Sequence, residues 1–467
     1  MTIDGKSVPY VATAGTLVLH DKEGQPTATM GYVAYTRSDA KDLAARPVTF
    51  AYNGGPGSSS IWLHMGALGP RRVAVSDAGP TPPPPYRVVD NDFSILDRTD
   101  LVLIDPVGTG LSRPAGKKKE KDFWGVDPDI ESVGAFIKQY VTLNGRWNSP
   151  KYILGESYGT TRSAGLVDYL QTKEGMAFNG VVLVSVVLDL SSIWEAPGSD
   201  RPYPLFLPSF AATSWYHKLL PAQPPALGPF LDEVRAWASG PYTVALMKGD
   251  ALSPAEKDSV AERIHRYTGL SADYIRKANL RVTEGEYTQQ VLRERRETVG
   301  RLDSRFTGLA FDQLAQNAEY DPQAAAISAG YTAAFLDYYH RELGVPRDRE
   351  YVVSAPAYRT WDWKHRVAGS EFPQMIVNTT PDLAHALGYN PELRVLVLNG
   401  LFDLATPFLG TEYTMDHLGL TPELRSHVTM RYYEAGHMMY VNDASMRRMR
   451  ADLAGFYDGA AGIARGR

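Results

Sequence analysis

The sequence contains no cysteine. Disulfide bonds, thiolate-bound metals and a cysteine nucleophile are therefore excluded together, whereas the redox compartment stays open. The chain also lacks an apolar run of the roughly 18 residues that a membrane-spanning helix needs, and its first residues are too polar to form the core of a signal peptide. We therefore expect a soluble chain with no membrane partner.

An excess of positive charge is also missing. The 467 residues include 48 lysines and arginines against 53 aspartates and glutamates, which gives a formal net charge of −5. Such a chain has no basic field to attract a phosphate backbone, so nucleic acid is not an expected partner. The HExxH motif of zinc hydrolases is absent and the ten histidines are scattered. We therefore predict neither a metal site nor a cofactor.

The pentapeptide Gly155-Glu156-Ser157-Tyr158-Gly159 matches the GxSxG pattern of a nucleophile elbow. In that motif a serine stands on a tight turn between a strand and a helix, with glycines where side chains would not fit. Residues 151–154 have the apolar pattern of a short strand, and residues 160–170 have apolar positions at helical spacing. The motif alone also fits an ordinary tight turn, so catalysis requires partner residues elsewhere in the chain.

Several apolar runs predict a mainly parallel central sheet with helices on both faces, an α/β fold. A β-hairpin is expected at residues 8–37, and further strands are expected at 48–52, 101–105, 181–187, 394–398 and 428–433. A helix at residues 130–141 separates two of these strands, in the alternating order that parallel sheets require.

The middle of the chain differs in character. Residues 1–188 and 390–467 form the predicted core domain, and residues 189–389 form a predicted, mostly helical cap insertion. Within this insertion Ser253-Pro254-Ala255-Glu256 is a capping box that predicts a helix start. Further helices are expected at 271–278 and 324–343. Prolines are expected to separate the helical segments, namely Pro202, Pro204, Pro208, Pro221, Pro224 and Pro225.

Asp403 and His437 each follow a predicted strand, as Ser157 does. The carboxyl ends of parallel strands meet at one edge of a sheet, and the order Ser, Asp, His is that of an α/β-hydrolase triad. Ser157 would attack a carbonyl carbon, His437 would transfer the proton, and Asp403 would orient the imidazole. His417 and His427 also follow Asp403, but the first lies in a helix-like run and the second at the wrong end of its strand.

A glycine-rich loop, residues 53–60, follows the strand predicted at 48–52. A phosphate cradle is one interpretation, but the loop has neither the GK[ST] ending nor the GxGxxG spacing. An oxyanion loop is the other. The Tyr158 amide, directly after the nucleophile, would donate one hydrogen bond to the oxyanion, and the loop at Gly54 and Gly55 is placed to supply another.

Taken together, these motifs resemble the serine carboxypeptidase family. The resemblance rests on Asn53-Gly54-Gly55-Pro56-Gly57-Ser58-Ser59, on residues 155–159, on Asp403 after Gly400-Leu401-Phe402, and on Ala435-Gly436-His437-Met438. It implies an α/β-hydrolase with a helical cap that removes C-terminal amino acids from peptides with a free C-terminus. It also implies a secreted or periplasmic enzyme, and the absence of the family's disulfides points to a bacterial-type member.

The resemblance also implies three sets of site residues. The catalytic triad would be Ser157, Asp403 and His437; the oxyanion hole would be formed by Gly55 and Tyr158; and the free α-carboxylate of the substrate would be bound by Asn53, Gly54 and Glu156.

One departure from the family pattern concerns this carboxylate site. Two carboxylates at hydrogen-bond distance share a proton, and in well-known members a second glutamate partners the one equivalent to Glu156. Here Ala67 stands at that second position, before Leu68-Gly69-Pro70, and we expect Glu156 to ionise more readily without an acidic neighbour. The departure keeps open an esterase or acyltransferase with the same triad. A third hypothesis is an inactive hydrolase scaffold that serves only in binding.

Overall fold

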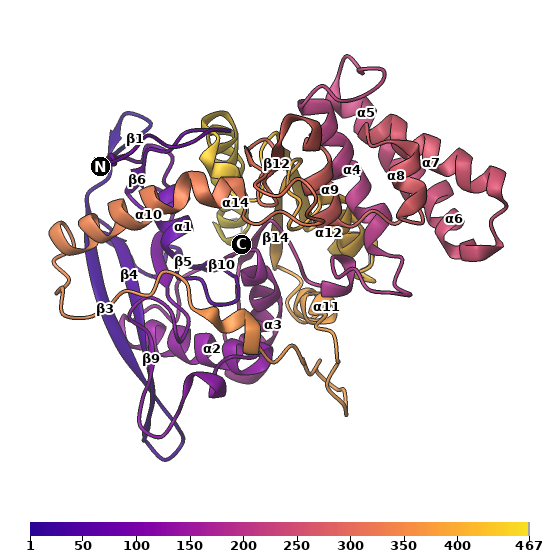
Figure 1. Ribbon diagram of the computed structural model, residues 1–467. Helices are drawn as coiled ribbons and strands as arrows, with labels where there is room; N and C mark the ends of the chain where they lie inside the picture. Colours follow the sequence, from indigo (N-terminus) through magenta and orange to yellow (C-terminus); the bar gives the residue numbers. More distant parts are fainter. Residues whose placement is uncertain (466–467) are drawn as a thin grey trace.

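A central sheet of nine strands organises the molecule (Figure 1). The computed structural model describes the backbone of residues 1–465 and the side chains of residues 1–459. From one edge to the other the sheet contains β15 (Val428–Tyr433), β14 (Arg394–Gly400), β11 (Gly180–Val184), β10 (Lys151–Glu156), β5 (Val48–Tyr52), β8 (Asp100–Ile104), β4 (Pro26–Arg37) and β3 (Tyr10–His20), and β9 (Arg113–Pro114) pairs with β4.

The strands from β15 to β8 are parallel, whereas β4 and β3 are antiparallel, which confirms the predicted mainly parallel sheet and the N-terminal hairpin. Every residue of β5, β8, β10 and β11 is buried, as expected for parallel strands covered on both faces. The strand predicted at 181–187 ends at Val184, because Ser185 takes a left-handed conformation with φ of +52°.

Helices cover both faces of the sheet, as predicted (Figure 1). One face packs against α2 (Val126–Leu143), α3 (Tyr158–Glu174) and α11 (Thr380–Tyr389). The other face packs against α1 (Ile61–Leu63), the short π-helix η1 (His64–Leu68), α10 (Pro322–Arg341) and α14 (Asp443–Arg465). Outside these layers, α12 (Phe408–Asp416) and α13 (Pro422–Arg425) connect the last two strands, and two small hairpins pair β1 (Thr2–Ile3) with β2 (Lys6–Ser7) and β6 (Arg71–Val73) with β7 (Val88–Asp90).

A group of helices beyond the sheet forms a third hydrophobic cluster. These helices are α4 (Pro202–Tyr216), α5 (Leu227–Trp237), α6 (Thr243–Lys248), α7 (Pro254–Thr268), α8 (Ala272–Lys277) and α9 (Glu284–Gln290). In Figure 1 the part from α5 to α8 projects to the upper right, away from the sheet. The predicted capping box is present at the start of α7, where the Ser253 hydroxyl accepts from the Glu256 amide.

The structure corrects two details of the cap. Pro202, Pro204 and Pro208 lie inside α4 and do not separate helices. The first turn of a helix needs no N–H donor, and α4 is buried along most of its length, so packing supports the helix despite Pro208. A small hairpin of β12 (Glu297–Val299) and β13 (Thr307–Leu309) was not predicted, because such short strands show little hydrophobic alternation.

Residues 189–389 do not all pack together as one cap. Its first part, α4 to α9, packs in the cap cluster, whereas α10 and α11 pack against the two faces of the sheet. The cap cluster also includes Phe402 and Leu404, the two neighbours of Asp403. The cap is therefore packed against the loop that carries one of the candidate catalytic residues.

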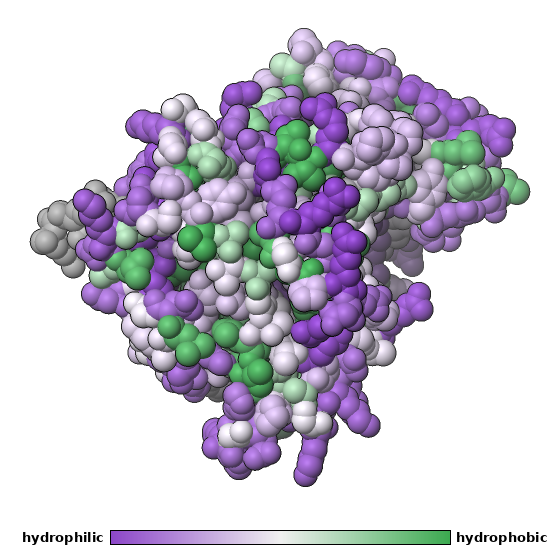
Figure 2. All heavy atoms as spheres, turned by 90° about the vertical axis from the view of Figure 1, so that its left-hand side faces the viewer, coloured by the Kyte–Doolittle hydropathy of each residue, from purple (hydrophilic) through white to green (hydrophobic). Residues whose placement is uncertain are grey.

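Hydrophobic atoms on the face shown in Figure 2 lie in small groups separated by hydrophilic ones. Among the helices of residues 1–465, none is both long and apolar enough to cross a bilayer.

Candidate active site

Ser157 stands on a sharp turn between β10 and α3. It takes φ of +60° and ψ of −131° at the N-cap of α3, a conformation that L-residues rarely adopt outside functional sites. Its amide donates to the carbonyl of Val184 at 2.9 Å. A Cβ atom on Gly155 would collide with the carbonyl oxygen of Gly159. The geometry is that of a nucleophile elbow, and glycine is required at position 155 because the turn leaves no space there for a side chain.

Asp403 follows β14 and is completely buried. Its Oδ1 atom accepts the amides of Ala405 and Thr406 at 2.8 and 2.9 Å. Its Oδ2 atom lies 2.8 Å from Nδ1 of His437 and accepts the Thr406 hydroxyl at 2.7 Å. The carboxylate therefore has a full set of hydrogen-bond partners that hold it against the imidazole.

His437 follows β15 and is buried. Burial by itself would lower its pKa, but the charge and hydrogen bond of Asp403 outweigh burial, so the pKa lies above the ordinary value. His437 and Ser157 line the same two cavities. Among the described residues no hydrogen bond joins them, and catalytic hydrogen bonds often tighten only when substrate is bound.

Two cavities meet at Ser157. The aromatic cavity, about 200 Å³, is named for Phe206, Trp194, Trp363 and Tyr358 in its wall. The glycine-loop cavity, about 230 Å³, contains Asn53, Gly54 and Glu156. Both are lined by Gly55, Ser157, Arg301, Leu302 and His437. A substrate bound across Ser157 would thus have space on each side of the bond that reacts.

The glycine loop packs directly on the first turn of α3. A Cβ atom on Gly54 would lie 2.5 Å from the Tyr158 amide nitrogen. The loop is also fastened to α3 by the buried Arg162, whose guanidinium donates to the carbonyl of Asn53 at 3.0 Å. Tyr158 is the first residue of α3, where an amide has no partner inside the helix. Among the described residues the Gly55 amide also makes no hydrogen bond. Both amides are free to bind an oxyanion.

Asn53 and Glu156 are hydrogen-bonded to each other. Asn53 Nδ2 donates to Glu156 Oε1 at 2.9 Å, and the Tyr440 hydroxyl donates to Glu156 Oε2 at 2.7 Å. Complete burial raises the pKa of Glu156 to about 7, although His437 and these two hydrogen bonds act in the opposite direction. Burial thus hinders the ionisation of Glu156 even though Ala67 leaves it without a second acidic neighbour. Tyr440 is the second partner of Glu156.

Sequence reasoning missed several residues of this site. The Asp403-to-Thr406 spacing is a turn signal that would have identified Thr406. No local pattern indicates Arg301, Leu302 or Tyr440, because each reaches the site through tertiary contacts.

Two acidic residues in the aromatic cavity were also missed. Burial raises the pKa of Glu195 to about 8 and that of Glu284 to about 7. The cavity is therefore less negative at neutral pH than its two carboxyl groups suggest.

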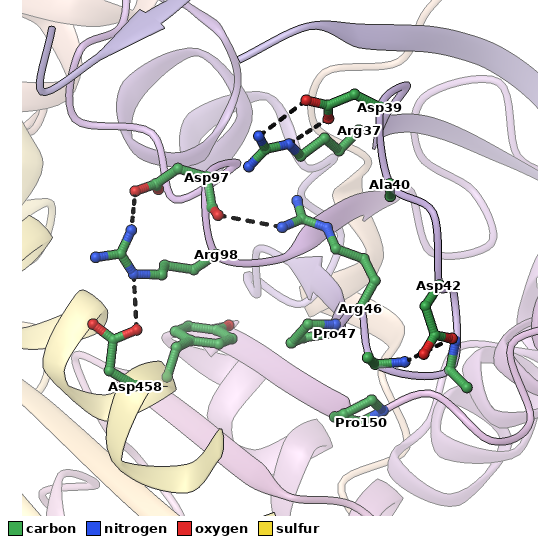
Figure 3. A pocket seen from close by; sticks show the side chains of 13 residues that line it. Arg37, Asp39, Ala40, Asp42, Arg46, Pro47, Asp97, Arg98, Pro150 and Asp458 are labelled. Carbon is green, nitrogen blue, oxygen red and sulfur yellow. Dashed lines mark hydrogen bonds and ion pairs between the residues drawn. The ribbon is translucent and has the colours of Figure 1, made fainter. Parts of the chain in front are cut away.

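A larger cavity, about 530 Å³, lies elsewhere, at the amino ends of β5 and β10 beside Pro47 and Pro150. Ligands of open parallel sheets bind at the carboxyl ends of the strands. Figure 3 shows that guanidinium groups of this cavity are already paired with carboxylates, Arg37 with Asp39, and Arg98 with Asp97 and Asp458. We therefore place the candidate site at Ser157.

In the part of the chain whose side chains the structure describes, no group of three or more His, Asp or Glu residues could hold a metal ion.

Comparisons with known proteins agree with this geometry. The model of the serine carboxypeptidase family matches residues 20–188. The pheromone-processing carboxypeptidase KEX1 of Saccharomyces cerevisiae is 31% identical over 166 residues, which are 33% of this chain and 21% of that protein. The match thus spans only about a fifth of the length of this relative. The matched part includes the glycine loop and Ser157, and Asp403 and His437 lie outside the family match.

One solved structure extends the likeness over nearly the whole fold. The crystal structure of a prohormone-processing carboxypeptidase from Saccharomyces cerevisiae, KEX1(delta)p, aligns with a TM-score of 0.58 at 16% identity, covering 97% of this chain and 92% of that chain. A proline iminopeptidase from Mycobacterium smegmatis aligns with a TM-score of 0.43 at 16% identity, covering 97% of this chain and all of that one. The fold is thus that of the α/β-hydrolases, and residues 20–188 of this chain are similar to the serine carboxypeptidase family.

Proposed function

We propose that this protein is a serine carboxypeptidase, which releases C-terminal amino acids from peptides through an acyl-enzyme on Ser157. One observation carries the proposal above the others. The imidazole of His437 is held 2.8 Å from the completely buried Asp403, at the junction of two cavities that Ser157 also lines. This is the arrangement that nucleophilic catalysis by serine requires.

In the proposed acylation step, Ser157 Oγ attacks the carbonyl carbon of the last peptide bond. His437 Nε2 takes the hydroxyl proton, while Nδ1–H donates to Asp403 and so fixes the tautomer. The raised pKa of His437 favours the imidazolium that forms at this point. The tetrahedral intermediate collapses when His437 returns the proton to the nitrogen of the leaving amino acid.

The negative oxygen of the intermediate would be bound by the amides of Gly55 and Tyr158. Both donors belong to backbone that is already fixed, the first by the packing of the glycine loop and the second by the helix that starts there. Preorganised donors of this kind stabilise the transition state without reorganisation during the reaction. In the deacylation step, water attacks the acyl-enzyme with His437 as the general base, and Ser157 is regenerated.

The two cavities suggest how the peptide is oriented. The residues proposed to bind the free α-carboxylate, Asn53, Gly54 and Glu156, all line the glycine-loop cavity. The C-terminal residue would therefore lie there, and the side chain before the scissile bond would enter the aromatic cavity. We also infer an exported enzyme from the family resemblance, which fractionation of the source cells would test.

The test uses a defined peptide and its C-amidated twin, followed by mass spectrometry over time. Stepwise loss of residues from the free C-terminus, with little loss from the amidated peptide, is the expected result. Ser157→Ala should lose about 10⁶-fold in kcat and should no longer react with a fluorophosphonate. Equal turnover of both peptides would reject the C-terminal exopeptidase. Hydrolysis of a short-chain ester assayed in parallel, with neither peptide cleaved, would favour the esterase or acyltransferase alternative.

A further inference from the structure

The glycine-loop cavity needs a positive group if it is to hold a carboxylate firmly. Glu156 cannot provide this charge, because a carboxyl group is either neutral or negative. Both of its oxygens also already accept hydrogen bonds, from Asn53 and Tyr440. When ionised, Glu156 would repel a second carboxylate. Asn53 can offer only its remaining amide hydrogen, since its Oδ1 atom accepts the amide of Leu63.

Arg301 is the one lysine or arginine among the described residues that line this cavity. Its side chain is 51% exposed, and its nearest acidic partner, Glu284, is 3.6 Å from Nε. That distance is too long for a hydrogen bond. No other described residue accepts a hydrogen bond from the Arg301 guanidinium. Apart from this longer ion pair with Glu284, its N–H donors are available to a ligand.

The backbone at Arg301 is held in place by the loops that carry the candidate triad. Arg301 lies between β12 and β13, and its carbonyl oxygen accepts the amide of Leu404 at 3.0 Å. The carbonyl of the next residue, Leu302, accepts the amide of His437 at 2.6 Å. The backbone beside the guanidinium is thus hydrogen-bonded to the loops of both Asp403 and His437. A long side chain anchored in this way can reach a substrate atom next to the reacting bond.

A neighbouring arginine on the same turn shows the contrast. Arg305 is buried and committed to structure, because its guanidinium pairs with Asp303 at 2.6 Å and with Asp77 at 2.9 Å. Arg301 makes only the 3.6 Å ion pair with Glu284, and it lines both cavities, which Arg305 does not.

We propose that Arg301 binds the free α-carboxylate of the peptide substrate in the glycine-loop cavity. This inference rests on the proposed carboxypeptidase function and names the group that would select a free C-terminus. The guanidinium matches a carboxylate in a bidentate pair.

Three variants test the proposal: Arg301→Gln, Arg301→Lys and the control Arg276→Gln. Arg276 is a suitable control because it lies on α8 away from both cavities, is 41% exposed, and pairs with Asp258 at 3.4 Å. Steady-state kinetics are measured with a peptide of neutral side chains, its C-amidated twin and a neutral short-chain ester. Circular dichroism and fluorophosphonate labelling of Ser157 establish that each variant is folded.

For the free-acid peptide, Arg301→Gln should raise KM by roughly 10- to 100-fold, the usual effect of losing a charged hydrogen-bond partner. The KM for the neutral ester should change far less than that for the peptide, because the ester has no carboxylate to bind, and Ser157 should still be labelled. Arg301→Lys should recover part of the loss because it restores the charge without the bidentate geometry, and Arg276→Gln should match the wild type.

An unchanged KM for the free-acid peptide in Arg301→Gln would overturn the inference while leaving the carboxypeptidase function intact. An effect that appears only with peptides carrying an acidic side chain before the scissile bond would also overturn it, since Arg301 would then serve the aromatic cavity. If the wild type cleaves the ester but neither peptide, the proposed function fails, which is a different result from either of these.

Discussion

The main-chain amide of His437 donates a hydrogen bond of 2.6 Å to the carbonyl oxygen of Leu302. Leu302 belongs to the turn between β12 and β13, within the interval predicted as the cap, whereas His437 follows the edge strand of the core sheet. The neighbouring residues are joined in the same way: the Gly436 amide donates to Asp303 Oδ2 at 3.0 Å. The loop with the candidate base is therefore held by the cap.

Replacing Asp303 should weaken both the fold and the site. Asp303→Ala removes the acceptor of the Gly436 amide and leaves the buried Arg305 with only the half-exposed Asp77 as a partner. We expect the free energy of unfolding to fall by about 3 kcal/mol and the rate of ester hydrolysis to fall as well. Urea unfolding and kinetics measure the two effects. Asp273→Ala, at an exposed ion pair on α8, is the control and should change neither; a fully stable Asp303→Ala would contradict the coupling.

Substituting Asp403 should disable the imidazole without disturbing the turn at Ser157. In Asp403→Asn the side-chain amide can donate a hydrogen bond to His437 Nδ1, which favours the tautomer that cannot accept the serine proton. A loss of about 10⁴-fold in kcat is expected, measured with peptide and ester alike. Asp416→Asn, at an exposed ion pair with Arg425, should retain full activity. Near-normal kcat in Asp403→Asn would remove Asp403 from the proposed triad.

A methyl group on Gly54 should displace the oxyanion donors. The added Cβ would lie 2.5 Å from the Tyr158 amide nitrogen, so the glycine loop and the start of α3 must move apart. We expect kcat to fall by roughly 10²- to 10³-fold, comparable to losing one oxyanion donor. Gly228→Ala is the matched control because nothing lies within 4 Å of its added Cβ. Equal kinetics for the two variants would show that the close packing at Gly54 has no part in catalysis.

The pH profile should respond to Glu156. The charge of Glu156 helps to raise the pKa of His437, and His437 must be neutral to accept the serine proton. In Glu156→Gln the imidazolium loses that stabilisation, so its pKa falls and activity persists to lower pH. Measuring kcat/KM for a neutral ester against pH, in the variant and the wild type, tests the direction. A shift of the acidic limb to higher pH would contradict the electrostatic coupling.

The stability of the fold should also depend on Glu156. Burial raises the pKa of this carboxyl from 4.5 to about 7 in the folded chain. A raised folded pKa stabilises the fold fully below the unfolded pKa, and this stabilisation is lost as the pH rises through 7. The difference between the two pKa values corresponds to about 3 kcal/mol. Between pH 5 and pH 8, the free energy of unfolding measured in urea should decrease less for Glu156→Gln than for the wild type. Equal decreases would show that the buried carboxyl is not the source of the pH dependence.

Much of the core could be predicted from local pattern. Buried parallel strands are continuous apolar runs, so β5 and β15 were predicted with the boundaries that the structure shows. The elbow at Ser157 is encoded by neighbouring residues, because glycines must stand where a side chain would collide. Asp403 and His437 could be selected because each follows a strand, and parallel strands bring their carboxyl ends to one edge.

The rest of the site was decided by tertiary structure. Arg301 and Leu302 reach the cavities, and Tyr440 reaches Glu156, through contacts between segments far apart in the chain, and no short-range pattern records such contacts. The pKa of Glu156 is likewise set by complete burial, which depends on the packing of the whole fold. The sequence by itself determined which residues can do the chemistry and at which end of each strand they stand. Only the packing of cap against sheet decided which groups surround them, because burial and charge pairing are properties of the folded chain.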